Sequence, residues 1–529
     1  MTKLITTSIK DQAMYLPENI AIQNDDIEIS YQTLHNDIHK FSSALLGLNI
    51  DKGSRIGVFL PKQPETVIAM FGSLSAGACL VPINPALRAL QVEHILNDCE
   101  VSVLITSLIR LEQLSIIIER CPALKKIILV DKKIPDQKYS VSVTSWKCFC
   151  SPANNLSIEV NETDIAAIFY TSGSSGNPKG VVVTHRNLSV GAESVIQFLN
   201  LSAQDRILAV LPLSFDYGFS QLTTALSVGA TVCLLDHLFP KDVINALETF
   251  DITGLAGIPT LWFQLAKLEW PAPIKNQLRY ITNSGGVLSE NLISHYRNLL
   301  PSTEIYLMYG LTEAFRSTYL EPDQIVSRPL SIGKAIPNAE VFILNQENEE
   351  CRPDEIGELV HAGPLVASAY WNNPGETKKR FRPLPESLPS KYNNQQQAAW
   401  SGDLVKKDSE GYIYFVARKD AMIKTSGYRI SPTEIEQVIL NVNNIDQCAV
   451  FSVSHDELGQ AIIATVIFKD HKDLNNMELQ PSLKKLMPAY MIPKIFNTRS
   501  HLPMTENGKV DRKKLIREFE NYFTQSSND

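Results

Sequence analysis

The chain has 529 residues, of which 44% are hydrophobic and 20% charged, and its formal net charge is −8. This composition is typical of a folded globular protein and excludes a disordered one. The acidic balance argues against nucleic-acid binding, because proteins that neutralise phosphates carry a basic face or a basic balance. The length predicts about three or four structural units of ordinary size.

The chain shows no signal for secretion or membrane insertion. Residues 1–8 lack the charged-then-apolar pattern of a secretory leader. The longest apolar stretch, near residues 69–81, is interrupted by Ser and Gly and is too short to span a bilayer. Eight cysteines are scattered without a C-x-x-C pair, which predicts core or surface thiols. We therefore expect a cytoplasmic protein without a membrane contact.

Strand-like and helical patterns alternate through the first half of the chain. Apolar runs at 55–60, 101–105 and 126–130 alternate with helical patterns at 65–74 and 90–96. This alternation is typical of an α/β domain with parallel sheets. The pattern recurs from 206–210 to 230–235 and predicts a second, similar α/β layer.

A loop of small residues lies between apolar runs at 165–169 and 181–184. Glycines let its backbone turn tightly towards an anion, hydroxyl groups donate hydrogen bonds, and one lysine adds charge. The residues in question are Thr171, Ser172, Gly173, Ser174, Ser175, Gly176, Lys179 and Gly180. Walker, dinucleotide and serine-elbow patterns are all absent. The loop predicts a phosphate cradle, and a flexible surface turn is the alternative.

A second polar segment, residues 309–313, follows the apolar run 305–308. It is expected on a loop at the end of a strand, where α/β sheets usually bind ligands. Its carboxylate, Glu313, is a type of ligand that suits Mg²⁺. Taken alone, such a segment is more often a structural turn.

The character of the chain changes after residue 331. Short β runs at 340–344, 357–361 and 411–415 predict a small β subdomain over residues 331–419. A helix at 432–440 and strands near 447 and 461 predict a small α+β domain over residues 420–529. The expected fold is α/β: a core of residues 1–419, made of two layered α/β subdomains and the β subdomain, and then a mobile C-terminal lid domain.

Five motifs in a fixed order resemble those of the adenylate-forming superfamily, which contains acyl-CoA synthetases, luciferases and nonribosomal peptide synthetase adenylation domains. They occupy residues 170–180, 309–313, 400–403, 417–427 and 502–511. The resemblance covers essentially the whole chain. Ser401 and Ala417 depart from the usual Thr and Gly, and both changes are mild.

The resemblance implies ATP and Mg²⁺ and a role for each matching residue. Lys509 would bridge the substrate carboxylate and the α-phosphate as charge develops, with Thr312 as its catalytic companion. Glu313 would hold Mg²⁺, and Asp420 would be the hinge of the lid. The remaining contacts to ATP would come from Thr171, Ser172, Gly173, Ser174, Ser175, Gly176, Lys179, Gly285, Gly286, Tyr309, Gly310, Thr312, Asp403 and Arg418.

Asp216 discriminates between substrate classes, because amino-acid-activating members bind the substrate α-ammonium with an Asp at this place. A carboxylate in a partly buried pocket is costly unless a cation pairs with it. An acid without the amine should therefore be rejected by ~10⁴ or more. A helix cap or a solvated turn is the alternative for Asp216. The acid pocket is expected around Asp216, Tyr217, Ser220 and Met308, with Asn283 and Arg316 close by.

The segments 215–218 and 308–316 are similar to those of stand-alone L-proline-activating ligases of pyrrole-type and anatoxin-type pathways. This similarity implies activation of an amino acid, L-proline first, as aminoacyl-AMP, and its transfer to the phosphopantetheine thiol of a separate carrier protein. An AMP-forming acyl-CoA ligase for a small or fatty carboxylic acid is the main alternative. An amidase-type hydrolase and a catalytically silent nucleotide-binding scaffold are weaker ones.

Overall fold

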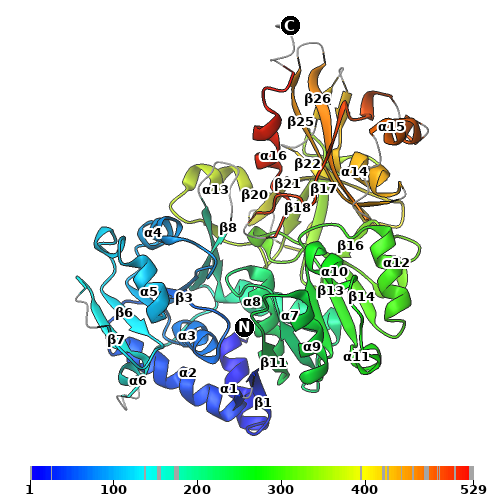
Figure 1. Ribbon diagram of the computed structural model, residues 1–529. Helices are drawn as coiled ribbons and strands as arrows, with labels where there is room; N and C mark the ends of the chain where they lie inside the picture. The colour runs from blue at the N-terminus through cyan, green and yellow to red at the C-terminus, as the bar shows by residue number, and fades with distance from the viewer. Residues whose placement is uncertain are drawn as a thin grey trace.

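The computed structural model describes residues 3–25, 27–135, 139–151, 156–171, 178–392, 396–419, 423–425, 428–442, 444–455, 458–469, 476–484, 486–487, 489–505 and 508–523. A large N-terminal part and a small C-terminal part, drawn in orange and red, are distinct in Figure 1. Within these ranges, no helix combines the length and the apolar character that a membrane crossing requires. All eight cysteines are free thiols.

The first sheet has eight strands in the order β19-β9-β8-β4-β3-β5-β6-β7. Its centre is parallel, as expected, whereas β8, β9 and β19 pair antiparallel at one edge. The strands are β3 (Arg55–Phe59), β4 (Cys79–Pro82), β5 (Val103–Thr106), β6 (Lys126–Leu129), β7 (Ser142–Ser145), β8 (Ile165–Thr171), β9 (Lys179–Thr184) and β19 (Ala369–Tyr370). Its connections include α3 (Pro64–Ser75), α4 (Ala89–Asp98), α5 (Leu108–Leu114) and α6 (Trp146–Phe149).

The second sheet joins the expected second α/β layer to the expected β subdomain. Its order is β17-β18-β21-β22-β16-β15-β14-β13-β12-β10-β11-β1-β2, with β20 beside β21. The α/β half contains β1 (Ile20–Asn24), β2 (Ile27–Ser30), β10 (Arg206–Ala209), β11 (Thr231–Leu234), β12 (Gly254–Gly257), β13 (Tyr280–Asn283), β14 (Glu304–Tyr309) and β15 (Thr318–Leu320). The other half contains β16 (Ser331–Ala335), β17 (Glu340–Leu344), β18 (Gly357–Ala362), β20 (Phe381–Pro383), β21 (Gln397–Lys407) and β22 (Ile413–Arg418). Residues 331–419 thus extend an existing sheet, and β19 leaves this segment to join the first sheet.

Two helices, α7 (His185–Leu199) and α8 (Asp216–Val228), occupy the centre of the large part (Figure 1). Phe219 of α8 stacks on Phe71 of α3 and also contacts Phe169 of β8. One hydrophobic core therefore includes residues of both sheets and of α8 between them. This packing fixes the start of α8, where the acid pocket is expected. The other helices of the large part are α1 (Ile5–Tyr15), α2 (Tyr31–Leu46), α9 (Pro240–Thr249), α10 (Pro259–Leu265), α11 (Ala272–Gln277), α12 (Glu290–Leu299) and α13 (Pro374–Arg380).

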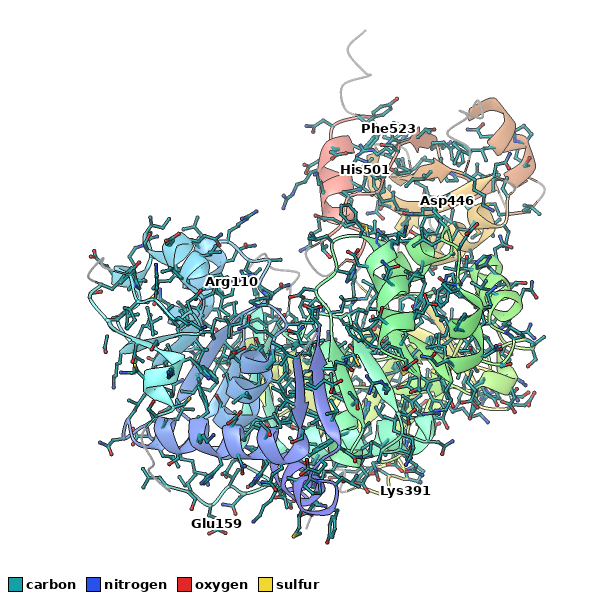
Figure 2. All side chains as sticks on the ribbon, turned by 60° about the horizontal axis from the view of Figure 1, so that its bottom comes forward. Arg110, Glu159, Lys391, Asp446, His501 and Phe523 are labelled. Carbon is teal, nitrogen blue, oxygen red and sulfur yellow. The ribbon has the colours of Figure 1, made fainter. Side chains whose placement is uncertain are left out.

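The C-terminal part has its own three-stranded sheet of β25 (Ile445–His455), β26 (Gly459–Phe468) and β27 (Ile495–Thr498), besides the short hairpin β23 (Ile423–Thr425) and β24 (Tyr428–Ile430). Its helices are α14 (Pro432–Leu440), α15 (Asn476–Lys484) and α16 (Arg512–Phe519). Figure 2 shows Asp446 near the junction with the large part, where its carboxylate lies 3.4 Å from Lys267 Nζ. This matches the expected α+β domain. Asp420, which is expected to be both the domain boundary and the hinge, lies outside the described residues.

Candidate active site

The position of Asp216 follows from a close approach of two backbone segments. Asp216 is the first residue of α8, which begins soon after β10 ends. A Cβ added to Gly218 would lie 2.0 Å from the carbonyl oxygen of Pro212, so only glycine allows the helix to start so close to this loop. Asp216 therefore lies near the carboxyl ends of the parallel strands, where ligands bind in such sheets.

Asp216 is surrounded by a hydroxyl group and two cations. Thr312 Oγ1 donates a hydrogen bond of 3.1 Å to its Oδ1. Burial raises the pKa of Asp216 above its ordinary value, whereas Arg316, the Thr312 hydrogen bond and Lys509 each lower it. The structure thus brings together three residues that are far apart in the sequence, Asp216, Thr312 and Lys509.

Arg316 is the second charged group of the expected acid pocket. Its side chain is nearly buried, with 2% of the residue exposed, and its Nη1 donates to Ser284 Oγ at 3.0 Å. Its guanidinium carbon lies 4.4 Å from the centre of the Tyr217 ring. Its Nε has no hydrogen-bond partner among the described residues. Burial lowers the pKa of Arg316, and Tyr217 and Asp216 raise it.

The backbone before Arg316 is strained. Phe315 has φ 58° and ψ −81°, a conformation that bulky residues rarely adopt. The chain folds back here, since Ser317 N donates to Tyr309 O at 2.9 Å. The Phe315 ring packs on Gly191 so closely that an added Cβ would lie 2.8 Å from it. This turn is what carries Arg316 into the interior, beside Asp216.

The other residues expected in the acid pocket lie on α8 and towards the ends of β13 and β14. The Tyr217 hydroxyl lies 2.7 Å from Thr282 Oγ1 on β13, and burial raises the pKa of Tyr217 to about 12. Ser220 is buried one helical turn after Asp216 and shares its face of α8. Met308 is buried on β14 in the central core. Asn283 Nδ2 donates to Gly286 O at 2.9 Å, while its buried Oδ1 has no partner among the described residues.

Tyr309, Asp403 and Arg418 come together as the motifs predict. The Tyr309 hydroxyl donates to Asp403 Oδ2, and Arg418 Nη1 lies 2.9 Å from Asp403 Oδ1. Asp403 and Arg418 face each other in the register of β21 and β22. Burial raises the pKa of Asp403, and Arg418 and Tyr309 partly offset this rise. The acceptor expected for the ribose is therefore held in place by its expected neighbours.

Glu313 fits the expected magnesium role. It is buried, accepts a hydrogen bond from the Tyr370 hydroxyl, and lies 3.5 Å from Arg380 Nε. No cluster of three or more acidic, His or Cys ligands occurs in the described ranges. Mg²⁺ commonly takes one or two protein carboxylates and completes its shell with phosphates and water. A single positioned carboxylate is thus sufficient for a magnesium ion that arrives with a phosphate chain.

The phosphate loop connects the antiparallel strands β8 and β9. Thr171 and Lys179 pair across this hairpin, and residues 172–177, with Ser172, Gly173, Ser174, Ser175 and Gly176, lie outside the described residues. Lys179 Nζ lies 2.6 Å from Glu376 Oε2. Glu376 was not expected from the sequence, nor were Tyr370 and Arg380. No sequence pattern links partners 197 residues apart, as Lys179 and Glu376 are.

Lys509 reaches the large part from a turn of the C-terminal part. A Cβ added to Gly508 would lie 2.6 Å from Ile258 Cδ1, and one added to Gly285 would lie 3.8 Å from Lys509 Cε. Gly285 has a φ of +83°, which favours glycine. The next residue, Gly286, packs on Pro259: an added Cβ would lie 3.0 Å from Pro259 Cγ. The pair of glycines and Lys509 therefore lie on the same side of the site as Asp216.

Two layered α/β units, a C-terminal unit that carries Lys509, and the contacts among Tyr309, Asp403 and Arg418 agree with what the motifs of the adenylate-forming superfamily imply. Residues 9–371 match the family described as AMP-binding enzyme, and residues 434–509 match the AMP-binding enzyme C-terminal domain. The chain belongs to the AMP-binding enzyme family. The expected superfamily is confirmed.

Similar proteins fall into two groups. The chain is 31% identical over 512 residues to a dimodular nonribosomal peptide synthase of Bacillus subtilis (strain 168), covering 95% of this chain and 20% of that protein. It thus spans about a fifth of that relative's length. It is 27% identical to a long-chain-fatty-acid–CoA ligase of the same organism, covering 98% of this chain and 94% of that protein.

Solved structures show the same fold. The o-succinylbenzoate CoA synthetase of Bacillus subtilis has a TM-score of 0.81 at 24% identity, covering 97% of this chain and 98% of that one. An anthranilate CoA ligase has a TM-score of 0.86 at 23% identity, covering 99% and 98%. A complex of the first holds ATP and a magnesium ion. These are the two ligands that the motifs of this chain lead us to expect.

Proposed function

We propose that this enzyme activates an amino acid, with L-proline as the first candidate, and passes it to the phosphopantetheine thiol of a separate carrier protein. In the first step the substrate carboxylate attacks the α-phosphate of ATP, and the bond to pyrophosphate breaks. In the second step the thiol attacks the carbonyl carbon of the aminoacyl-AMP, AMP leaves, and the thiol proton passes to solvent.

The residues of the chain contribute mainly by binding and by electrostatics. Lys509 holds the reacting carboxylate and the α-phosphate, and Lys179 holds the β- and γ-phosphates. Tyr309, Asp403 and Arg418 hold the nucleoside, and Glu313 holds Mg²⁺. Asp420 is proposed as the hinge that reorients the C-terminal part between the two steps.

The observation that carries the amino-acid proposal is the position of Asp216. Its carboxylate is partly buried and close enough to Lys509 for the lysine charge to lower its pKa. An α-amino acid carries its ammonium and carboxylate on one carbon, so one group can meet Asp216 while the other meets Lys509. The choice of L-proline rests on the amino-acid sequences of segments 215–218 and 308–316.

Pyrophosphate exchange across the amino acids tests this proposal. We expect ATP–pyrophosphate exchange above background with one or a few amino acids, L-proline foremost. Exchange with a simple carboxylic acid and with no amino acid would refute the role of Asp216. Exchange with another amino acid would refute L-proline alone.

A second candidate is an AMP-forming acyl-CoA ligase, which one observation favours. Arg316 lies beside Asp216 and lowers its pKa, so the carboxylate has a partial countercharge within the protein. Asp216 therefore depends less on a substrate ammonium than the sequence suggests. The similarity to a fatty-acid–CoA ligase over nearly the full length of both chains is in line with this alternative.

The acceptor thiol separates the two candidates. Mass spectrometry should show the amino acid loaded onto a holo carrier protein, while CoA remains free. Rapid formation of a CoA thioester with an unloaded carrier would favour the ligase.

A further inference from the structure

We propose that Glu376 is an internal competitor of the phosphate chain for Lys179, and so sets the affinity of the enzyme for ATP and pyrophosphate. This rests on the proposed function, in which Lys179 holds the β- and γ-phosphates. Lys179 Nζ lies 2.6 Å from Glu376 Oε2, with 13% and 34% of the two side chains exposed. A carboxylate oxygen at this distance occupies one of the three directions in which the ammonium can donate to an anion.

The position of Glu376 is fixed by the fold. β19 pairs with β9, the strand that begins at Lys179, and α13 follows β19 after three residues. Trp371 N donates to Gly180 O at 2.7 Å, which ties this segment to the end of the phosphate loop. Asn373 caps α13 by accepting from Glu376 N at 3.1 Å. Glu376 is thus presented to Lys179 by a strand pairing and a helix cap.

The pair also lies beside the proposed magnesium residue. Lys179 Nζ lies 5.6 Å from the centre of the Tyr370 ring, and the Tyr370 hydroxyl donates to Glu313. A phosphate chain bound to Lys179 and to a magnesium ion at Glu313 would bring its negative charge close to Glu376. The carboxylate would then repel the phosphates as well as compete for the lysine.

Lys379 moderates this competition. Its Nζ lies 2.8 Å from Glu376 Oε1, the oxygen that Lys179 leaves free. The two lysines hold the pKa of Glu376 at about 2, so the carboxylate is ionised throughout the working range. Loss of Lys379 should leave Glu376 with a stronger hold on Lys179, the opposite of the effect of losing Glu376.

Calorimetric titration with ATP, pyrophosphate and AMP tests the competition directly. Glu376→Gln should bind ATP and pyrophosphate roughly twofold to fivefold more tightly, the effect expected for one partly exposed ion pair. AMP, which lacks the β- and γ-phosphates, should bind with unchanged affinity. Lys379→Gln should weaken ATP and pyrophosphate binding. In a Lys179→Gln background, Glu376→Gln should have no effect.

Glu347→Gln is the matched control for net charge, because Glu347 is exposed on the turn between β17 and β18. Weaker or unchanged ATP binding by Glu376→Gln would overturn the proposal, as would equal tightening of AMP. If the wild-type protein binds neither ATP nor pyrophosphate, both the proposed function and this inference fail. If the wild-type protein binds them and Glu376→Gln matches it, only the inference fails.

Discussion

Asp216→Asn is the most informative perturbation of the acid pocket, because it removes a charge and keeps the shape of the side chain. The amide can still accept the 3.1 Å hydrogen bond from Thr312. It cannot pair with a substrate ammonium. Any change in substrate preference then reports the charge of Asp216 alone.

The expected loss follows from the two charges in the pocket. Removing one partner of a buried charge pair costs about 2–5 kcal/mol. Arg316 already offsets part of the charge of Asp216, which places the loss near the lower end of this range. We expect kcat/KM for the amino acid to fall about 100-fold, which is about 3 kcal/mol. The same reasoning reduces the discrimination against an acid without the amine from ~10⁴ to about 10²–10³.

The assay is pyrophosphate exchange with two substrates of the same shape. L-proline and tetrahydrofuran-2-carboxylate differ in that a ring oxygen replaces the ammonium. The wild-type enzyme should prefer L-proline, and Asp216→Asn should lose that preference by losing L-proline activity alone. Arg316→Gln should widen the preference, because Asp216 then lacks its internal countercharge. An equal loss for both substrates in Asp216→Asn would refute the pairing.

Three further variants test the proposed catalytic lysine, the start of α8 and a buried histidine. Lys509→Ala should lower the rate of adenylation by roughly 10²–10³. The rate of thioester formation from supplied aminoacyl-AMP should fall much less. Lys514→Ala, on exposed α16, is the control and should change neither rate. Gly218→Ala should lower the unfolding free energy by about 1–3 kcal/mol in urea titrations, because the new Cβ would lie 2.0 Å from the Pro212 carbonyl oxygen. Gly375→Ala is the control and should be neutral, because its Cβ would lie 4.0 Å from the nearest atom, Asn373 Oδ1. Burial lowers the pKa of His361 to about 3. Below pH 6.5 this histidine is therefore protonated in the unfolded chain and neutral in the folded state, so the unfolding free energy falls as the pH falls. His361→Gln should reduce the slope of unfolding free energy against pH by about 1.4 kcal/mol per unit between pH 6.5 and 4.5, and His501→Gln serves as the control.

The local elements could be predicted because each depends on a pattern within one segment. The apolar runs at 126–130, 206–210 and 357–361 became β6, β10 and β18, and the helical pattern at 65–74 became α3. The joining of residues 331–419 to the second sheet could not be predicted in this way. It depends on hydrogen bonds between β15 and β16 and between β16 and β22, whose partners no local pattern specifies.

The site residues that carry a motif could likewise be predicted, whereas those that depend on distant partners could not. The sequence predicted that Tyr309, Asp403 and Arg418 would act together, because motifs mark all three, and the structure places them in contact. It did not predict Glu376, whose partner Lys179 is 197 residues away. It also left Arg316 as a neighbour of the pocket without a stated effect. The strained turn at Phe315, which brings Arg316 to Asp216, depends on close packing against Gly191.

Under the proposed function, the charge balance between Asp216 and Arg316 decides how strictly the site can select for an amine. A lone buried carboxylate would need the substrate ammonium for its stability, and selection would then be strong. Here burial still raises the pKa of Asp216 despite Arg316, which means that the internal countercharge is incomplete. A substrate ammonium can supply the part of the positive charge that Arg316 does not. The pocket should therefore prefer an amino acid while retaining measurable activity with the matching acid that lacks the amine.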